Sequence, residues 1–259
     1  MTDTRYIAHL TDSHLLADPD ACLHGWAVAE AFKRVWADMR ACLPAPDALV
    51  LGGDLVDDRS PAGYRWLADQ LAALDCPVLA VAGNHDDPHA MTQHLRGAHV
   101  HGALYLGPWR LIGLNTQVPG AEHGQLREHD RQRLDTALKD STRYTVAVMH
   151  HPPIAVGTAW IDAIGLADRT VLADQVAASA SCRGILAGHV HQAFTGRLGD
   201  CPIWTTPSTM RQFRPGATTF TEDKAVAPGW RWLALHDDGG VETGLRRVGD
   251  PRRRIALKA

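Results

Sequence analysis

Five short apolar runs of the sequence each end in side chains that can bind a metal ion. Asp12 and His14 are two residues apart after one run, and His189 and His191 are two apart after another. Residues i and i+2 of an extended chain point to the same face, so each pair projects together. The other three runs end in Gly53-Asp54-x-x-Asp57, Gly83-Asn84-His85-Asp86 and His150-His151. One pair alone would be weak support, but five ends with the same donors indicate a site for Mn, Fe or Zn.

These donors need elements that bring distant segments together. The apolar runs have the length and the Val, Leu and Ile content of buried strands, and sites in α/β folds form at the carboxyl ends of strands. Helical patterns lie between them, over residues 24–43, 60–74, 126–140 and 168–180. This alternation predicts a layered α/β fold with helices outside the sheet. We expect one domain over residues 1–259, in which the strands of 196–250 complete a second sheet and rim the site.

Charge, cysteine content and hydropathy exclude several classes of protein. The formal net charge of −3 gives no basic field of the kind that binds nucleic acid. The five cysteines are odd in number and form no CxxC motif, which favours a reducing compartment over a disulfide framework. No signal-like segment begins the chain, and no apolar run is long enough to span a membrane. We therefore predict a cytoplasmic protein, monomeric or homodimeric, with no membrane or nucleic-acid partner.

The five blocks, in this order across residues 12–191, resemble those of the calcineurin-like metallophosphoesterases. The stretches TTPSTMRQFRPGATTF and NTQVPGAEHGQL also look like segments of the bacterial class III 3',5'-cyclic AMP phosphodiesterases. The resemblance implies a four-layer α/β/β/α sandwich, with two stacked mixed sheets flanked by helices. It also implies hydrolysis of 3',5'-cyclic AMP to 5'-AMP by a metal-bridging hydroxide. Paired metals can generate hydroxide near neutral pH and clamp the phosphoryl oxygens.

The same resemblance assigns seven ligands to two transition-metal ions, with Fe and Mn favoured and Zn as an alternative. The first ion would be held by Asp12, His14, Asp54 and His191, and the second by Asp54, Asn84, His150 and His189, with Asp54 bridging. His85 would contact the phosphate and stabilise or protonate the leaving oxygen. Asp57 and Asp86 have two readings: they either orient the imidazoles or cap ordinary turns.

Three residues are weaker candidates for substrate binding. His24, in the loop after the first ligand pair, could reach the mouth of the site or remain on the surface. Phe213 could stack on a nucleobase or pack in the core. The flanking Arg211 and Arg214 could add positive charge beside it, and we select Arg214 as the third candidate.

The metal ligands do not separate substrates, so alternatives remain open. We expect a cyclic nucleotide or another small phosphodiester. The same site would also serve glycerophosphodiesters, 2',3'-cyclic nucleotides or nucleotide-sugar pyrophosphates. A metal-free scaffold that binds protein partners is a different class, and the complete ligand set counts against it. A nuclease would need a basic stripe that the sequence lacks.

Overall fold

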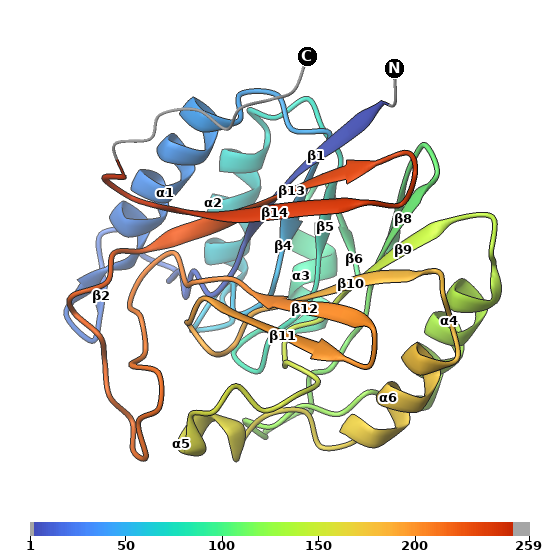
Figure 1. Cartoon of the computed structure of the whole chain (residues 1–259). Coiled ribbons are helices and arrows are strands. Elements are labelled where there is room, and N and C mark those ends of the chain that lie inside the picture. Colours follow the sequence, from blue (N-terminus) through green and yellow to red (C-terminus); the bar gives the residue numbers. More distant parts are fainter. Residues whose placement is uncertain (1–2, 251–259) are drawn as a thin grey trace.

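The computed structural model describes residues 3–250, and residues 1–2 and 251–259 of the predicted domain lie outside the described part. Two six-stranded mixed sheets form its centre (Figure 1). The first has the order β14 (Val241–Arg247), β13 (Gly229–His236), β1 (Thr4–Leu10), β4 (Ala48–Leu51), β5 (Val78–Ala80), β6 (Ala98–Val100). The second has the order β11 (Phe194–Leu198), β12 (Cys201–Thr205), β10 (Cys182–Ala187), β9 (Tyr144–Val148), β8 (Trp109–Gly113), β7 (Ala103–Leu106).

Three apolar clusters separate four layers of structure. Val50 of β4 and Val146 of β9 belong to the cluster between the two sheets, while their neighbours Leu49 and Ala147 belong to the two outer clusters. The outer cluster of the first sheet includes side chains of α1 (Val28–Cys42), α2 (Pro61–Leu71) and α3 (Pro88–His94). That of the second includes side chains of α4 (Glu128–Lys139) and α6 (Arg169–Ala177). The predicted α/β/β/α sandwich is therefore confirmed.

The helices predicted from periodicity are present, with shorter bounds. α1 begins at Val28 because the residues before it form a hairpin of β2 (Cys22–Leu23) and β3 (Trp26–Ala27). The turn of this hairpin places His24 and Gly25 at positive φ, which a helix does not allow. α2 begins at Pro61, where the Ser60 side chain accepts a hydrogen bond from Gly63 N. Within residues 3–250, no helix is long and apolar enough to cross a membrane.

The C-terminal strands divide between the two sheets, contrary to the prediction that they complete the second. β11 and β12 join the second sheet, but the β13–β14 hairpin extends the first, where β13 pairs antiparallel with β1. β13 also contributes to two cores, with Trp230 on the helix side and Leu233 between the sheets. A local pattern predicts a strand, but its partner strand is chosen by contacts far away in the sequence.

The strand ends that carry the candidate ligands meet at one place. β1, β4 and β5 run parallel in the first sheet, and β9 and β10 run parallel in the second. The loops that follow are bonded across the two sheets: His189 N donates to the carboxylate of Asp12, and His150 Nδ1 donates to Gly52 O at 2.8 Å. The stacked sheets thus bring five loops to a common edge.

Candidate metal centre and its cavity

All seven predicted ligands converge at this edge, and all are buried. They are Asp12, His14, Asp54, Asn84, His150, His189 and His191. Five of them have the left-handed backbone conformation: Asp12 (φ 55°), His14 (45°), Asp54 (49°), His189 (68°) and His191 (48°). This conformation is uncommon outside glycine, and it turns the chain sharply where the strand stops. Gly53 adds room at the same turn, because a Cβ there would lie 2.6 Å from His150 Nδ1.

Two carboxylates occupy the middle of the cluster. Asp12 Oδ1 lies 3.3 Å from His191 Nε2, and Asp54 Oδ2 lies 3.2 Å from His150 Nε2. Burial alone would raise the pKa of both carboxyls, but the neighbouring imidazoles hold the pKa of each below its ordinary value. Asp54 Oδ1 also accepts a hydrogen bond from His85 N at 2.8 Å. Both aspartates are thus held in place as anions.

The outer nitrogens of three histidines are engaged with fixed acceptors. The Nδ1 atoms of His14, His150 and His191 lie 2.8, 2.8 and 3.0 Å from Asp57 Oδ1, Gly52 O and Arg211 O, respectively. These acceptors require a proton on Nδ1, so each neutral ring has its lone pair on Nε2, facing inward. An outer partner of this kind sets the tautomer of many metal-binding histidines.

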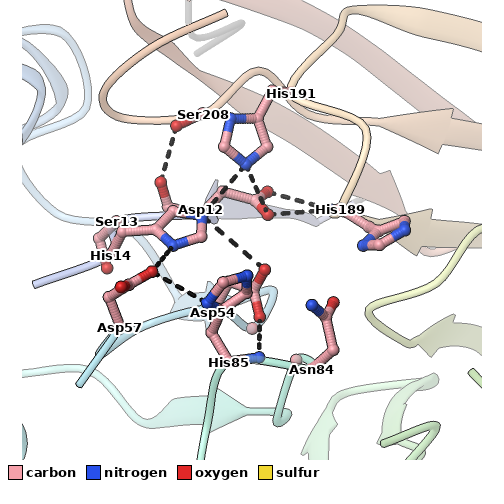
Figure 2. A network of polar contacts seen from close by, with 12 residues as sticks. Asp12, Ser13, His14, Asp54, Asp57, Asn84, His85, His189, His191 and Ser208 are labelled. Carbon is pink, nitrogen blue, oxygen red and sulfur yellow. Dashed lines mark hydrogen bonds and ion pairs between the residues drawn. The ribbon is translucent and has the colours of Figure 1, made fainter. Parts of the chain in front are cut away.

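The inward atoms are acceptors that face one another. His14 Nε2 lies 3.2 Å from His191 Nε2, and both lie against the central carboxylates (Figure 2). Asn84 Oδ1 is buried with no hydrogen-bond partner among the described residues, and His150 Nε2 lies against the Asp54 carboxylate at 3.2 Å. Facing lone pairs at this distance need a proton or a cation between them. The mixture of carboxylate, amide and imidazole donors suits transition-metal ions, so the residues present fit the metal ions that the sequence predicts.

The candidate donor atoms fall into overlapping groups in space. The donor atoms of Asp12, His14 and His191 all lie within 4.8 Å of one another, and so do those of Asp12, Asp54 and His150. Asp12 therefore lies near the candidate ligands of both ions. His189 has Nε2 at 3.1 Å from Ile164 O, which leaves its Nδ1 as the free nitrogen.

His151 also stands in a group of possible donors, with His150 and His189. Its Nδ1 lies 2.8 Å from Thr116 Oγ1, and its Nε2 lies 3.0 Å from Glu122 O. Burial lowers the pKa of His151 to about 3, so the ring is neutral and both nitrogens are engaged. His151 is therefore placed to support the neighbouring loops, with neither ring nitrogen left for a metal ion.

His85 and His14 share one carboxylate oxygen. Asp57 Oδ1 lies 2.8 Å from His14 Nδ1 and 2.9 Å from His85 Nδ1 (Figure 2). Burial would lower the pKa of His85, but the hydrogen bond to Asp57 and the charges of Asp54 and Asp57 raise it overall. With Nδ1 engaged, Nε2 is the nitrogen of His85 that remains free. Asp57 therefore contacts imidazoles, which is one of its two predicted roles.

Within residues 3–250, Asp86 accepts no hydrogen bond from an imidazole, and this departs from the role of orienting histidines. Its buried carboxylate accepts hydrogen bonds from the backbone N–H groups of Leu55, Val56 and Gly83, and from the hydroxyl of Tyr64. Burial, together with the charge of Asp54, raises its pKa to about 6. Asp86 joins the loop after β4 to the loop after β5, and so fixes the ligands on both.

A cavity of about 220 Å³ opens over the metal centre. It is lined by His14, Asp54, Asn84, His85, Glu122, Trp160, Ile161, Ile164, His189, His191, Arg211, Phe213 and Phe220. Of the three weaker candidates, only Phe213 is in this lining. His24 and Arg214 are exposed and absent from it. Arg211, the other arginine near Phe213, lines the cavity in place of the predicted Arg214.

Sequence reasoning missed two of the three aromatic rings in this lining, Trp160 and Phe220. Trp160 lies in α5 (Ala159–Asp162), shortly after the His150-His151 segment, and Phe220 lies in the loop before β13. Tryptophans pack in the core more often than they contact ligands, which hid Trp160. No local pattern singles out Phe220.

Comparison with known proteins gives consistent results. The model of the calcineurin-like phosphoesterase family matches residues 5–193. The chain is 35% identical over 246 residues to the 3',5'-cyclic adenosine monophosphate phosphodiesterase CpdA of Pseudomonas aeruginosa, covering 94% of this chain and 90% of that protein. It is 34% identical over 250 residues to CpdA of Escherichia coli, covering 95% and 90%. A dimetal phosphatase from Danio rerio shares the fold, with a TM-score of 0.65, 14% identity, and coverage of 95% and 99%.

Proposed function

The chain belongs to the calcineurin-like phosphoesterase family and is a metal-dependent phosphodiesterase; we propose that it hydrolyses 3',5'-cyclic AMP to 5'-AMP. The names of its bacterial relatives support this substrate. One observation supports the proposal most directly: acceptor atoms face inward around Asp12 and Asp54. Such a set of acceptors fits cations, and the bound cations would attract an anionic phosphodiester. The complete ligand set also counts against a metal-free scaffold.

We propose that the seven buried ligands hold two transition-metal ions, with Fe or Mn favoured and Zn as the alternative. Such a pair would supply a nucleophile near neutral pH and positive charge for the phosphoryl oxygens. The protein fixes the positions of the donors through their outer partners: Gly52 O for His150, Arg211 O for His191 and Asp57 for His14.

His85 is proposed to act on the leaving group. Its side chain lies at the cavity, is 42% exposed, and has Nδ1 held by Asp57. Nε2 can therefore face the 3' oxygen as the P–O bond breaks and give that oxygen a hydrogen bond or a proton. The carboxylate of Asp57 favours the protonated ring, which is the form that can donate.

A substrate panel tests the proposal. Protein reconstituted with Mn²⁺ is assayed with 3',5'-cyclic AMP, 3',5'-cyclic GMP, 2',3'-cyclic AMP, a glycerophosphodiester and a nucleotide sugar. We expect the highest kcat/KM with 3',5'-cyclic AMP. If a glycerophosphodiester, a 2',3'-cyclic nucleotide or a nucleotide sugar exceeds it by more than about tenfold, a difference of about 1.4 kcal/mol in transition-state stabilisation, that substrate replaces the cyclic nucleotide.

A further inference from the structure

The cavity over the metal centre has two chemically different halves. One half consists of the candidate ligands and His85. The other is formed mainly by apolar side chains, with the rings of Trp160, Phe213 and Phe220 at its centre. Phe213 joins the halves, because its ring lies parallel to His191 at 4.1 Å and edge-on to Phe220 at 5.3 Å. A molecule that places a phosphate on the first half must rest its neighbouring group on the second.

Within the second half, Phe220 is the most exposed of the three rings. It is 54% exposed, whereas Phe213 is 6% exposed and already covered on one side by His191. Trp160 and Phe213 both meet Phe220 edge to face, with interplanar angles of 66° and 69°. Because Phe220 is exposed and also lines the cavity over the polar centre, its ring is accessible to a ligand that enters the cavity.

The segment that carries Phe220 is fixed by hydrogen bonds on both sides. Arg214 N donates to Thr221 O at 2.8 Å, and Asp223 N donates to Gln212 O at 2.8 Å. Trp26 Nε1 donates to Glu222 at 2.9 Å, which ties the segment to the β2–β3 hairpin. The ring therefore stands at a defined place next to the cavity, which limits the conformational entropy that a ligand would lose on binding it.

Two polar groups complete this half. The guanidinium of Arg211 lies 5.5 Å from the ring centre of Phe213 and 5.3 Å from that of Phe220. The indole Nε1 of Trp160 is buried without a hydrogen-bond partner among the described residues, which is unusual for a buried donor. Flat rings and a guanidinium suit a planar heterocycle that offers a π face and acceptor nitrogens.

We propose that Phe220, backed by Trp160, is the stacking surface for the purine base of the bound nucleotide. This inference rests on the proposed function for the choice of a nucleotide, and it replaces Phe213 as the residue that reads the base. Phe213 then serves mainly to support His191. Stacking tolerates different purines, so the surface selects nucleotides over smaller phosphodiesters more strongly than it selects adenine over guanine.

Binding of two phosphate compounds tests the inference without turnover. 5'-AMP and ribose 5-phosphate carry the same phosphate and sugar, and differ by the base. Their affinities for the Mn²⁺-reconstituted protein are measured by titration calorimetry. We expect 5'-AMP to bind about 5- to 20-fold more tightly, as one stacked base would give. In Phe220→Ala this ratio should fall close to one, and Phe220→Trp should restore it.

Tyr105→Ala is the matched control, because Tyr105 is 60% exposed and lies outside the cavity lining. In Tyr105→Ala, the ratio of the affinities for 5'-AMP and ribose 5-phosphate should equal that of the wild type. Three results would overturn the stacking surface. The wild type could bind 5'-AMP no more tightly than ribose 5-phosphate, or Phe220→Ala could keep the wild-type ratio of the two affinities. Phe220→Leu, which has no aromatic ring, could also keep that ratio. Failure of the proposed function is distinct: the wild type would not turn over cyclic AMP, although the ratio of the two affinities could persist.

Discussion

The ring of Phe213 lies parallel to the ring of His191, with 4.1 Å between centroids and 7° between planes. The other side of His191 is fixed by a hydrogen bond from Nδ1 to Arg211 O at 3.0 Å. Phe213 and Arg211 therefore hold one imidazole from two directions. A side chain that first suggests a contact for the nucleobase is thus placed to support a candidate metal ligand.

Phe213→Ala should weaken metal binding by about tenfold, the lower end of the loss usual when a partner of a ligand is removed. The reason is that His191 loses the surface that orients its ring. Metal affinity is measured by competition with a coloured chelator, with Tyr105→Ala as the control. Unchanged metal affinity combined with weaker binding of 5'-AMP would return Phe213 to the role of a direct contact with the base.

Metal content is the most direct prediction for the cluster. Protein purified without chelators should contain about two transition-metal ions per chain by elemental analysis. Removing them should lower Tm by several degrees, because His14 and His191 would face each other across 3.2 Å without a cation. A content well below one per chain after reconstitution, with the circular dichroism of the folded protein intact, would refute the two-metal centre.

His85→Ala should retain the metals and lose turnover. We expect a loss of about 10²- to 10⁴-fold with cyclic AMP, because its leaving alkoxide is basic and gains most from a proton donor. The loss should be much smaller with bis(p-nitrophenyl) phosphate, whose leaving group needs little help. Equal losses with both substrates would show that His85 positions the phosphate and does not protonate the leaving oxygen.

Asp57→Asn should lower kcat/KM by about 10- to 100-fold, since one carboxylate orients both His14 and His85. The neighbouring Asp58→Asn is a matched control. Asp58 is exposed and accepts hydrogen bonds from Ala17 N and Ser60 N, away from the histidines. Steady-state kinetics and metal affinity are measured for both variants. Similar losses in the two would mean that negative charge near the site matters, and not the shared hydrogen bond.

The buried His101 allows a prediction of how the free energy of unfolding depends on pH. Its Nε2 accepts a hydrogen bond from Ala82 N at 2.9 Å, and burial lowers its pKa to about 4, with Asp130 and Arg133 acting in opposite directions. The folded state thus favours the neutral ring. The contribution of His101 to the free energy of unfolding is therefore fully present above about pH 6.5 and is lost as the pH falls towards 4. Charging the ring should cost about 2 kcal/mol of unfolding free energy, after allowance for partial exposure.

Urea denaturation at pH 7.5 and 4.5 measures this effect in metal-free protein. His101→Asn is the comparison, because asparagine tolerates the positive φ of 50° and does not titrate. The wild type should lose about 2 kcal/mol more than the variant between the two pH values. Parallel losses would assign the acid sensitivity to other groups.

The sequence allowed the strands of the site and their ends to be predicted for a physical reason. Buried parallel strands are continuous apolar runs, and their donors are the first polar residues after each run, as with His189 after β10. Helices followed from the 3.6-residue repeat, although the hairpin at His24 shortened α1. These features depend on neighbours along the chain, which a sequence displays directly.

Features that depend on distant contacts were not accessible in the same way. The pairing of β13 with β1 and the choice of Arg211 over Arg214 are set by segments far apart in the chain. Phe220 is a lone aromatic in a polar stretch, and only the folded loop places it beside Trp160. The cytoplasmic location, the state of assembly and the single-domain organisation stay predictions.

The left-handed backbone at five candidate metal ligands has a consequence for engineering. Asp12, His14, Asp54, His189 and His191 each hold a conformation that costs a non-glycine residue about 1–3 kcal/mol. Glycine at any of them would relax the chain while deleting a ligand. A library of variants selected only for heat resistance of the metal-free protein should therefore accumulate glycine at these five positions and drift toward stable, inactive proteins. Selection for a more durable enzyme has to measure turnover in every round, because the substitutions that most easily raise stability lie at the residues of the site itself.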